Sequence, residues 1–582
     1  MFKAWKVLSS KLQIEAILTA ILLFVNSILE LIGLAVIIPI LTVILEENAI
    51  ANNQYLYKIY NLLNLEQESI FLALLLGVIV LLFISKNLVS LFITYKQSRF
   101  SFSLYSFYST RLHQYFYSKG FIFFNQNNSN EIVKDINQVS LWYAKLLITP
   151  MLTLLNEVLV LIMIVVAIVV YNVQIIFILG LTVVPVAYLF YRVVRNFAKR
   201  YTERRNDLAA ELYKILYQSI AAYVDVKINN NSSWFFNQYK KGTEEVSEIE
   251  AKLHVLSLSS TKVLESSFIL ALAVITLYGI LYLENRSDLI ILLGVFGIAA
   301  YRVLPSINRI MNALISIKSY QFTFNTIKLS KHLTGDKKLM IDTKEQLAFK
   351  SSIKFEDISY GYSESTLILM GINLEINKGE TIGFIGESGA GKTTFFNVLL
   401  GLLDNYNGNI NIDDVRLDLE NIGKWRNNIG YVQQEVFLID GSIRDNIIFG
   451  SFELASDKER MKKAIEISSL RKLIDSLPDG IETHVGERGS KLSGGQRQRI
   501  GIARALFSGA EVLLFDEATS ALDNDTENEI TESIKKLSEH NFTILIIAHR
   551  YTTLKYCDYI VEFNDGQISR QYTYKELTQI KT

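Results

Sequence analysis

The chain has 582 residues, of which 50% are hydrophobic and 20% charged, and its 58 basic side chains equal its 58 acidic ones in number. A single hydrophobic core does not grow to this length, so at least two domains are expected. The balanced charge argues against nucleic acid as a partner. Cys557 is the only cysteine, which excludes an intramolecular disulfide and a cysteine-based metal cluster and fits a reducing compartment for the soluble part.

Long apolar runs are confined to the part of the chain before about residue 330. Spanning the hydrocarbon takes about 20 apolar residues in a helix. Six segments meet this requirement, at about 15–44, 69–94, 146–171, 174–193, 263–284 and 288–316. Buried helices of a soluble protein would not give six such runs with so few breaks. We therefore predict an all-α, six-helix transmembrane domain over residues 1–330.

The charges in the loops predict the orientation of these helices. Basic side chains gather in the stretches 95–145 and 192–262, whereas the loop 45–68 carries four glutamates and a single lysine. Positive charge stays on the cytoplasmic side, so the N-terminus, both long loops and everything after about 317 are expected in the cytoplasm. We therefore expect a multi-pass protein of the bacterial cytoplasmic (inner) membrane, embedded in the lipid bilayer. The first apolar run is too long for a cleaved signal peptide.

The two long loops have helical periodicity, which predicts that they continue the membrane helices, with turns near 121–135 and 220–236. A charged stretch at 331–350 is interpreted as a linker. Residues 351–582 alternate strand-like and helical patterns, which predicts an α/β domain. The whole chain is thus expected to be multi-domain, an all-α membrane part followed by an α/β part.

A phosphate-binding loop follows the apolar strand 381–385. The pattern G-x-x-x-x-G-K-[ST], placed between a strand and a helix, is a P-loop whose backbone N–H groups surround phosphate. Lys392 is expected to reach the β- and γ-phosphates of ATP, and the Thr393 hydroxyl to bind Mg²⁺. The expected nucleotide-binding residues here are Gly386, Glu387, Ser388, Gly389, Ala390, Gly391, Lys392, Thr393 and Thr394.

A second motif, which is acidic, supports the interpretation of residues 386–394 as a P-loop. The wholly apolar run 512–515 is typical of a buried parallel strand. It ends in Asp516, the expected place for a Mg²⁺-coordinating aspartate. The adjacent Glu517 is expected to act as the general base that polarises the attacking water.

The run Leu492-Ser493-Gly494-Gly495-Gln496-Arg497-Gln498-Arg499 resembles the signature motif of ABC ATPases. In that family the motif reaches across a dimer interface to the γ-phosphate held by the P-loop of the other subunit. The resemblance therefore implies that Ser493, Gly494, Gly495 and Gln496 contact nucleotide. The motif precedes a helical run, so it is also an anion-binding helix start.

Other elements of the same family occur in the expected order. Tyr362 resembles the aromatic residue that stacks on adenine, and Gln434 resembles the loop glutamine that senses Mg²⁺ and the transport domain. Asp523, in Ser520-Ala521-Leu522-Asp523, resembles the D-loop aspartate. His549 resembles the switch histidine that contacts the γ-phosphate. The one visible departure is Gln433, which replaces the proline usual before the loop glutamine.

The resemblance covers the whole chain and is to half-size ABC exporters, also called type IV transporters. It implies an ATP hydrolase that requires Mg²⁺ and drives alternating access of the membrane helices. Two ATP sites need two signature motifs, so the implied partner is a second copy of the chain or a related half-transporter. The turns near 121–135 and 220–236 are the implied coupling elements, the second docking on the partner's ATPase domain near its Gln434 loop.

Charged side chains inside a bilayer are functional candidates by default. The expected substrate residues are Glu30, Lys86, Arg302 and Arg309, and Glu157 also lies in an apolar run. The sequence 301–310 is similar to one in bacterial lipid-linked oligosaccharide flippases. Two arginines could hold a lipid pyrophosphate through bidentate hydrogen bonds. The alternative is that Arg309 only extends to the membrane surface.

The best hypothesis for the substrate is a lipid-linked oligosaccharide or another phosphate-bearing lipid. The alternative within transport is a peptide or multidrug exporter. An ABC-type gated channel is disfavoured by the intact hydrolytic residues. A soluble ABC ATPase that acts on DNA or translation is disfavoured by the six apolar segments.

Overall fold

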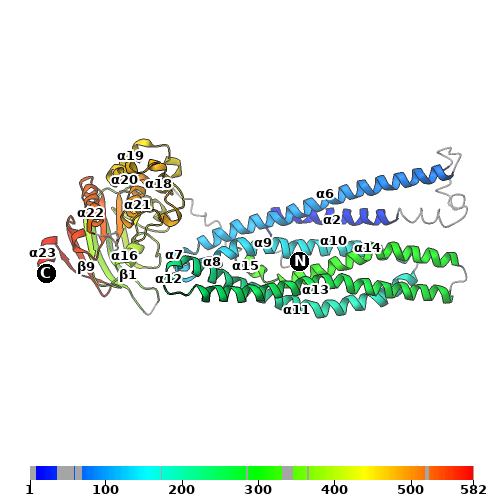
Figure 1. Ribbon diagram of the computed structural model, residues 1–582. Helices are drawn as coiled ribbons and strands as arrows, with labels where there is room; N and C mark the ends of the chain where they lie inside the picture. Colours follow the sequence, from blue (N-terminus) through cyan, green and yellow to red (C-terminus); the bar gives the residue numbers. More distant parts are fainter. Residues whose placement is uncertain are drawn as a thin grey trace. The chain divides into compact units, whose positions relative to one another are not determined.

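A computed structural model of the chain describes residues 8–35, 58, 60, 68–171, 173–282, 286–330, 345–363, 366–517 and 524–580. It divides into two compact units (Figure 1). The helical unit comprises Met1–Ser118 and Asn127–Gly335, and the α/β unit comprises Lys119–Gln126 and Asp336–Thr582. Residues 331–344 of the predicted linker 331–350 lie outside the described residues, so the assignment of this linker stays a prediction.

The helical unit consists of long helices joined by short helical turns (Figure 1). Its helices are α2 (Ser10–Ala35), α6 (Glu68–Tyr117), α8 (Ser129–Lys134), α9 (Ser140–Trp142), α10 (Thr149–Tyr171), α11 (Val173–Ala221), α12 (Tyr223–Ile228), α13 (Ser232–Tyr282), α14 (Arg286–Ser319) and α15 (Thr323–Leu329). Two π-helical turns, Asp135–Val139 and Tyr143–Ile148, flank α9. The short helix α7 (Gly120–Gln126) belongs to the α/β unit.

Four helical stretches in the described part of the chain are long and apolar enough to cross a membrane: Ser10–Gly33, Ala73–Tyr117, Ser129–Val169 and Ser232–Leu281. The predicted fourth and sixth segments lie within the helices α11 and α14. The end of the first predicted segment, 36–44, lies outside the described residues. The count of six spans therefore stays a prediction.

The prediction that the loops continue the membrane helices is confirmed. The helices α6, α11 and α13 contain 50, 49 and 51 residues. At 1.5 Å per residue each extends about 75 Å, roughly two and a half times the thickness of the hydrocarbon. Each helix therefore has a second half that reaches well beyond a bilayer.

The helices pack through an apolar core and carry a second apolar surface that faces outward. Val160, Leu264 and Phe268 lie in the core shared by α10, α13 and α14. On α6, by contrast, Leu81 and Leu91 are 68% and 66% exposed. Large apolar surfaces of this kind mark contact with lipid or with another protein. The helices are thus suited to a membrane on one side and to each other on the other.

The α/β unit contains two sheets and the helices that cover them. An antiparallel sheet has the order β2-β1-β4-β5, and a six-stranded sheet has the order β10-β9-β3-β8-β7-β6, in which β6 to β9 and β3 are parallel. The strands are β1 (Ser352–Tyr360), β2 (Leu369–Asn377), β3 (Thr381–Ile385), β4 (Asn407–Ile412), β5 (Val415–Arg416), β6 (Ile429–Val432), β7 (Val512–Asp516), β8 (Thr543–Ile547), β9 (Tyr559–Asn564) and β10 (Gln567–Tyr572). The helices are α16 (Lys392–Leu399), α17 (Ile422–Arg426), α18 (Ile443–Ile448), α19 (Lys458–Ile467), α20 (Arg471–Ser476), α21 (Gly494–Ser508), α22 (Asn524–Glu539) and α23 (Tyr574–Ile580).

The central strands β3, β7 and β8 are buried along their whole length. Helices cover both faces of such a sheet, which is why these strands read as continuous apolar runs. In open parallel sheets the ligand site forms beyond the carboxyl ends of the strands. The loops that follow Ile385, Asp516 and Ile547 are therefore the place to look for a site.

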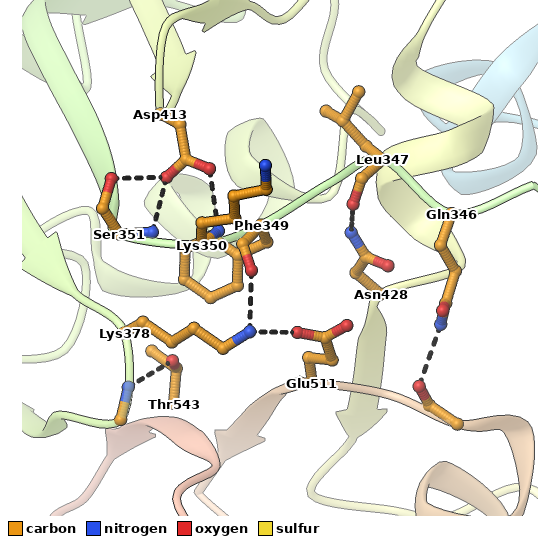
Figure 2. A network of polar contacts seen from close by, with 12 residues as sticks. Gln346, Leu347, Phe349, Lys350, Ser351, Lys378, Asp413, Asn428, Glu511 and Thr543 are labelled. Carbon is orange, nitrogen blue, oxygen red and sulfur yellow. Dashed lines mark hydrogen bonds and ion pairs between the residues drawn. The ribbon is translucent and has the colours of Figure 1, made fainter.

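A polar network fixes the start of the α/β unit to both sheets (Figure 2). The backbone N–H groups of Lys350 and Ser351 donate to the Asp413 carboxylate at 2.7 and 2.8 Å. Lys378 Nζ donates to the Phe349 carbonyl at 2.7 Å and pairs with Glu511 at 2.5 Å. Asp413 follows β4 of one sheet and Glu511 precedes β7 of the other. The segment before β1 therefore joins the two sheets.

Candidate functional site

The loop between β3 and α16 has the backbone that the sequence pattern requires. Gly386 and Gly391 have φ angles of 142° and 101°, where side chains are rarely accommodated. A Cβ atom on Gly386 would lie 2.3 Å from the Phe563 carbonyl oxygen, and one on Gly391 would lie 2.9 Å from the Ile368 carbonyl oxygen. At these two positions the loop thus packs too closely against its neighbours for a residue with a side chain. It leads directly into the N-terminus of α16, where phosphate binds well.

Lys392 opens α16 and folds back over this loop. Its Nζ donates to the carbonyl oxygens of Gly386 and Glu387, both at 2.8 Å. Burial lowers the pKa of Lys392, and the nearby carboxylates of Glu517 and Asp516 oppose that shift. The ammonium group is therefore held at the centre of the loop, the position from which it can reach phosphate oxygens.

Asp516 ends β7 with both carboxylate oxygens facing hydroxyl groups. Oδ1 lies 3.4 Å from Thr393 Oγ1, and Oδ2 accepts a hydrogen bond of 2.9 Å from the Tyr431 hydroxyl. Asp516 is 8% exposed, and this burial raises its pKa, while the hydrogen bond from Tyr431 opposes the rise. The structure thus brings together Thr393 and Asp516, as the sequence predicts, and adds Tyr431.

The donors at this point are oxygen atoms, which suit a hard divalent cation such as Mg²⁺. In the part of the chain that the structure describes, no group of three or more His, Cys, Asp and Glu side chains could hold a metal ion. A cation here would therefore depend on a hydroxyl, a single carboxylate and oxygens of its ligand. That is the usual arrangement for Mg²⁺ bound together with a nucleotide.

The two predicted catalytic residues lie in contact. His549 Nε2 is 2.8 Å from Glu517 Oε1. Glu517 has a φ angle of 51°, an uncommon conformation for a residue with a side chain, and its N–H donates to the Ile547 carbonyl at 3.0 Å. Strained backbone of this kind is concentrated at functional sites. The carboxylate is therefore turned toward the loop that carries His549.

The loop after His549 is held by Glu527, a residue that the sequence reasoning missed. Glu527 is 5% exposed and is the fourth residue of α22. Its carboxylate accepts hydrogen bonds from the Arg550 guanidinium and the Thr552 hydroxyl. A buried carboxylate needs such partners. The sequence did contain a signal for this contact, namely a glutamate soon after the D-loop motif and an arginine directly after the histidine.

The signature motif forms a helix start in the structure. Ser493 is the N-cap of α21, and its hydroxyl accepts from the Gln496 N–H at 3.3 Å. The Gln496 Oε1 accepts from the Ser493 N–H at 2.9 Å, which completes a capping box. Gly494 and Gly495 form the first turn. The side chain of Gln496 therefore stabilises the turn that presents the two glycines.

The remaining predicted nucleotide residues have different surroundings. Tyr362 is 52% exposed and makes an edge contact with Tyr360 at a centroid distance of 5.2 Å. Gln434 is exposed in the loop after β6. Asp523 lies outside the described residues, so its role stays a prediction.

The charged residues predicted from the apolar segments form two clusters. Glu30 of α2 accepts from Lys86 Nζ of α6 at 3.0 Å and lies 3.5 Å from Arg302 Nε of α14. Glu157 of α10 accepts from Arg309 Nε at 2.8 Å and Nη2 at 3.2 Å. Arg302 and Arg309 are thus paired with different carboxylates, and only the first cluster has an excess of positive charge.

Comparison with known proteins agrees with this geometry. A family model described as ABC transporter matches residues 369–520. The ATP-dependent lipid A-core flippase of Alcanivorax borkumensis is 30% identical over 409 residues, which are 68% of this chain and 68% of that protein. The chain belongs to the ABC exporters. Its helical unit and single ATPase domain are those of a half-size, type IV exporter.

Further relatives of this exporter agree over shorter lengths. The uncharacterized ABC transporter ATP-binding protein YwjA of Bacillus subtilis is 40% identical over 238 residues, which are 41% of each chain. A lipid A-core flippase of Saccharophagus degradans matches over 63% of its length, so both alignments cover less than two thirds of the relative. The solved structure of a bacterial Atm1-family ABC exporter with ATP bound has a TM-score of 0.77 at 21% identity, and the match covers 98% of both chains. The exporter fold thus extends over the whole chain.

Proposed function

We propose that this exporter uses ATP hydrolysis to move an amphiphilic substrate, best a lipid-linked oligosaccharide or another phosphate-bearing lipid, across the bacterial cytoplasmic membrane. The contact between Glu517 and His549, beside the P-loop and Asp516, carries this proposal. A general base held by a histidine beside a P-loop is the arrangement expected of an enzyme that hydrolyses ATP repeatedly. The N-terminus and the ATPase domain lie in the cytoplasm, where ATP is available.

Each residue of the ATP site has a distinct part in the proposed reaction. Lys392 binds the β- and γ-phosphates, and the P-loop N–H groups surround them. Glu517 takes a proton from the attacking water, and His549 holds the Glu517 carboxylate in line. Mg²⁺ would be held by Thr393, Asp516 and Gln434, and it supplies neutralisation of phosphate charge.

The proposed exporter works as a dimer, either of two copies or with a related half-transporter. Ser493, Gly494 and Gly495 of one chain complete the nucleotide site of the other, as the first turn of α21 is a ready anion site. ATP then brings two ATPase domains together. The long cytoplasmic halves of α6, α11 and α13 relay this closure to the membrane helices, which turn from inward-open to outward-open.

The charges of the helical unit support an anionic substrate group. Lys86 and Arg302 share the single carboxylate of Glu30, which leaves one net positive charge, whereas Arg309 and Glu157 cancel. Arg302 Nε is buried and makes no hydrogen bond within the part of the chain that the structure describes. A phosphate oxygen would accept a hydrogen bond from Arg302 Nε and balance the excess positive charge of this cluster. The names of the A. borkumensis and S. degradans relatives, lipid A-core flippases, support a lipid substrate.

Transport in proteoliposomes tests the substrate. We expect flipping of a pyrophosphate-linked glycolipid to fall at least about tenfold in Arg302→Ala and Lys86→Ala, because each removes charge-assisted hydrogen bonds worth about 1.5–3 kcal/mol. Basal ATP hydrolysis should persist, since neither residue lies in the ATP site. A neutral amphiphile is the control. If both variants flip the glycolipid normally, the phosphate-lipid proposal is wrong, and a peptide or multidrug exporter becomes the better hypothesis.

A further inference from the structure

We propose that Tyr431 is a positioning residue for the Mg²⁺–ATP site, acting through the carboxylate of Asp516. The inference rests on the proposed function, namely that Asp516 binds Mg²⁺ with ATP. The Tyr431 hydroxyl donates to Asp516 Oδ2 at 2.9 Å, and Thr393 Oγ1 lies 3.4 Å from Oδ1 on the other side. A carboxylate is planar, so fixing one oxygen fixes the direction of the other.

The sheet places Tyr431 where it can do this. Strands β6 and β7 are parallel neighbours, and Tyr431 pairs in register with Leu514, two residues before Asp516. The long phenol side chain spans that offset and brings its hydroxyl to the end of β7. Asp516 Oδ2 therefore accepts a hydrogen bond from a residue of β6, while Asp516 Oδ1 faces Thr393 at the start of α16. The Tyr431 hydroxyl thus orients the oxygen that faces the predicted metal ligand Thr393.

Tyr431 also lies three residues before Gln434, which is another predicted ligand of Mg²⁺. The hydrogen bond therefore connects the strand that supports the Gln434 loop to the carboxylate that ends β7. The surroundings of Asp516 explain why one hydroxyl matters. Asp516 is 8% exposed, so water cannot readily replace a lost donor.

Tyr431→Phe separates positioning from packing, because it keeps the ring and removes only the hydroxyl. A residue that only fills space would leave metal dependence unchanged. A residue that orients a metal ligand changes metal affinity, typically by about 10–100-fold. Tyr572→Phe is a matched control, since the Tyr572 hydroxyl donates to the Glu562 carboxylate at 2.8 Å in the same domain, on strands that carry no predicted metal ligand.

The test measures binding of trinitrophenyl-ATP to the full-length exporter in detergent as Mg²⁺ is titrated. The parent carries Glu517→Gln, so that nucleotide is retained. We expect Tyr431→Phe to raise the half-saturating Mg²⁺ concentration at least about tenfold, while affinity in EDTA stays at the parent value. Tyr572→Phe should match the parent in both measurements. In an Asp516→Asn background, Tyr431→Phe should cause no further change.

Three outcomes would overturn the inference while leaving the proposed metal site standing. One is an unchanged Mg²⁺ dependence in Tyr431→Phe when the parent depends on Mg²⁺. Another is an equal loss of affinity with and without Mg²⁺, which indicates a packing role or misfolding. The third is an undiminished effect in the Asp516→Asn background. A parent that binds nucleotide without any response to Mg²⁺ would contradict the proposed metal site itself, and with it the inference.

Discussion

His549 Nε2 lies 2.8 Å from Glu517 Oε1, although 32 positions separate the two residues in sequence. The contact follows from the sheet, because Asp516 at the end of β7 pairs in register with Ile547 at the end of β8. The next residues on each strand leave the sheet at the same edge. An ionised carboxylate only accepts hydrogen bonds, so the imidazole N–H donates to Glu517 and fixes its direction.

Glu517→Gln should reduce ATP turnover at least about 100-fold, because the general base is lost. Nucleotide binding should persist, since Lys392 and the P-loop are unchanged, and the variant should retain ATP. Steady-state hydrolysis and ATP retained after gel filtration are the measurements. Glu420→Gln, an exposed glutamate of the same domain, is the control. Near-normal turnover in Glu517→Gln would remove this residue from its role.

His549→Ala should also reduce turnover about 100-fold, and combining it with Glu517→Gln should cost little more than either change alone. Residues that act as a unit show such non-additive losses. The measurement is turnover of the four members of this double-mutant cycle at saturating ATP. A double variant whose loss equals the product of the single losses would show that the two side chains act independently, despite their contact.

Mixing Lys392→Ala chains with Gly494→Asp chains should restore activity that neither variant has by itself. A mixed dimer contains one site with an intact P-loop from one chain and an intact signature motif from the other. If the chains pair at random, turnover should reach roughly a quarter of the parent value. Mixtures that stay as inactive as either variant would show that the sites do not form across a dimer, or that both are required for turnover.

Glu157→Gln should destabilise the helical unit, because it weakens a bidentate pair between a 5% exposed carboxylate and Arg309. Arg309→Ala should cost more, about 1–3 kcal/mol, since the buried Glu157 carboxylate loses its cation and keeps only weaker partners such as the Ser306 hydroxyl. Thermal unfolding in detergent, followed by tryptophan fluorescence, is the measurement. Arg302→Ala, from the cluster with excess positive charge, should change Tm least. Equal Tm values for Arg309→Ala and Arg302→Ala would contradict a structural role for the Arg309 pair.

Asp413→Asn should destabilise the α/β unit by about 1–2 kcal/mol at neutral pH. Partial burial raises the pKa of Asp413, but hydrogen bonds from Ser352, Ser351 and Lys350 outweigh it and lower the pKa to about 2. A carboxylate with a lowered pKa stabilises the fold above its unfolded pKa of about 4, and this contribution disappears as the pH falls through about 2. Urea unfolding at pH 7 and pH 3 should therefore show a smaller difference at the lower pH. Asp414→Asn, at the exposed neighbour, should have no such effect.

The local motifs predicted much of the site because their chemistry depends on short-range geometry. Gly386 to Thr393 specifies a strand, a glycine loop and a helix start, and all three form where the pattern places them. The run 492–499 likewise predicted a helix start, which is a capping box at Ser493 and Gln496. The apolar length of 69–94 predicted a helix, since hydrocarbon thickness sets the length of a span.

The partners of these residues depended on the tertiary structure. Sequence spacing does not reveal that Tyr431 reaches Asp516 or that Glu527 holds Arg550, because strand order and helix packing bring each pair together. The sequence likewise offered Arg302 and Arg309 as one possible phosphate-binding pair, which stays a prediction. Their carboxylate partners come from the tertiary structure, since each arginine lies beside a carboxylate from a different helix. Residue type and spacing decided which groups can react, and long-range packing decided which of them meet, because a buried charge takes the partner that the neighbouring helix or strand supplies.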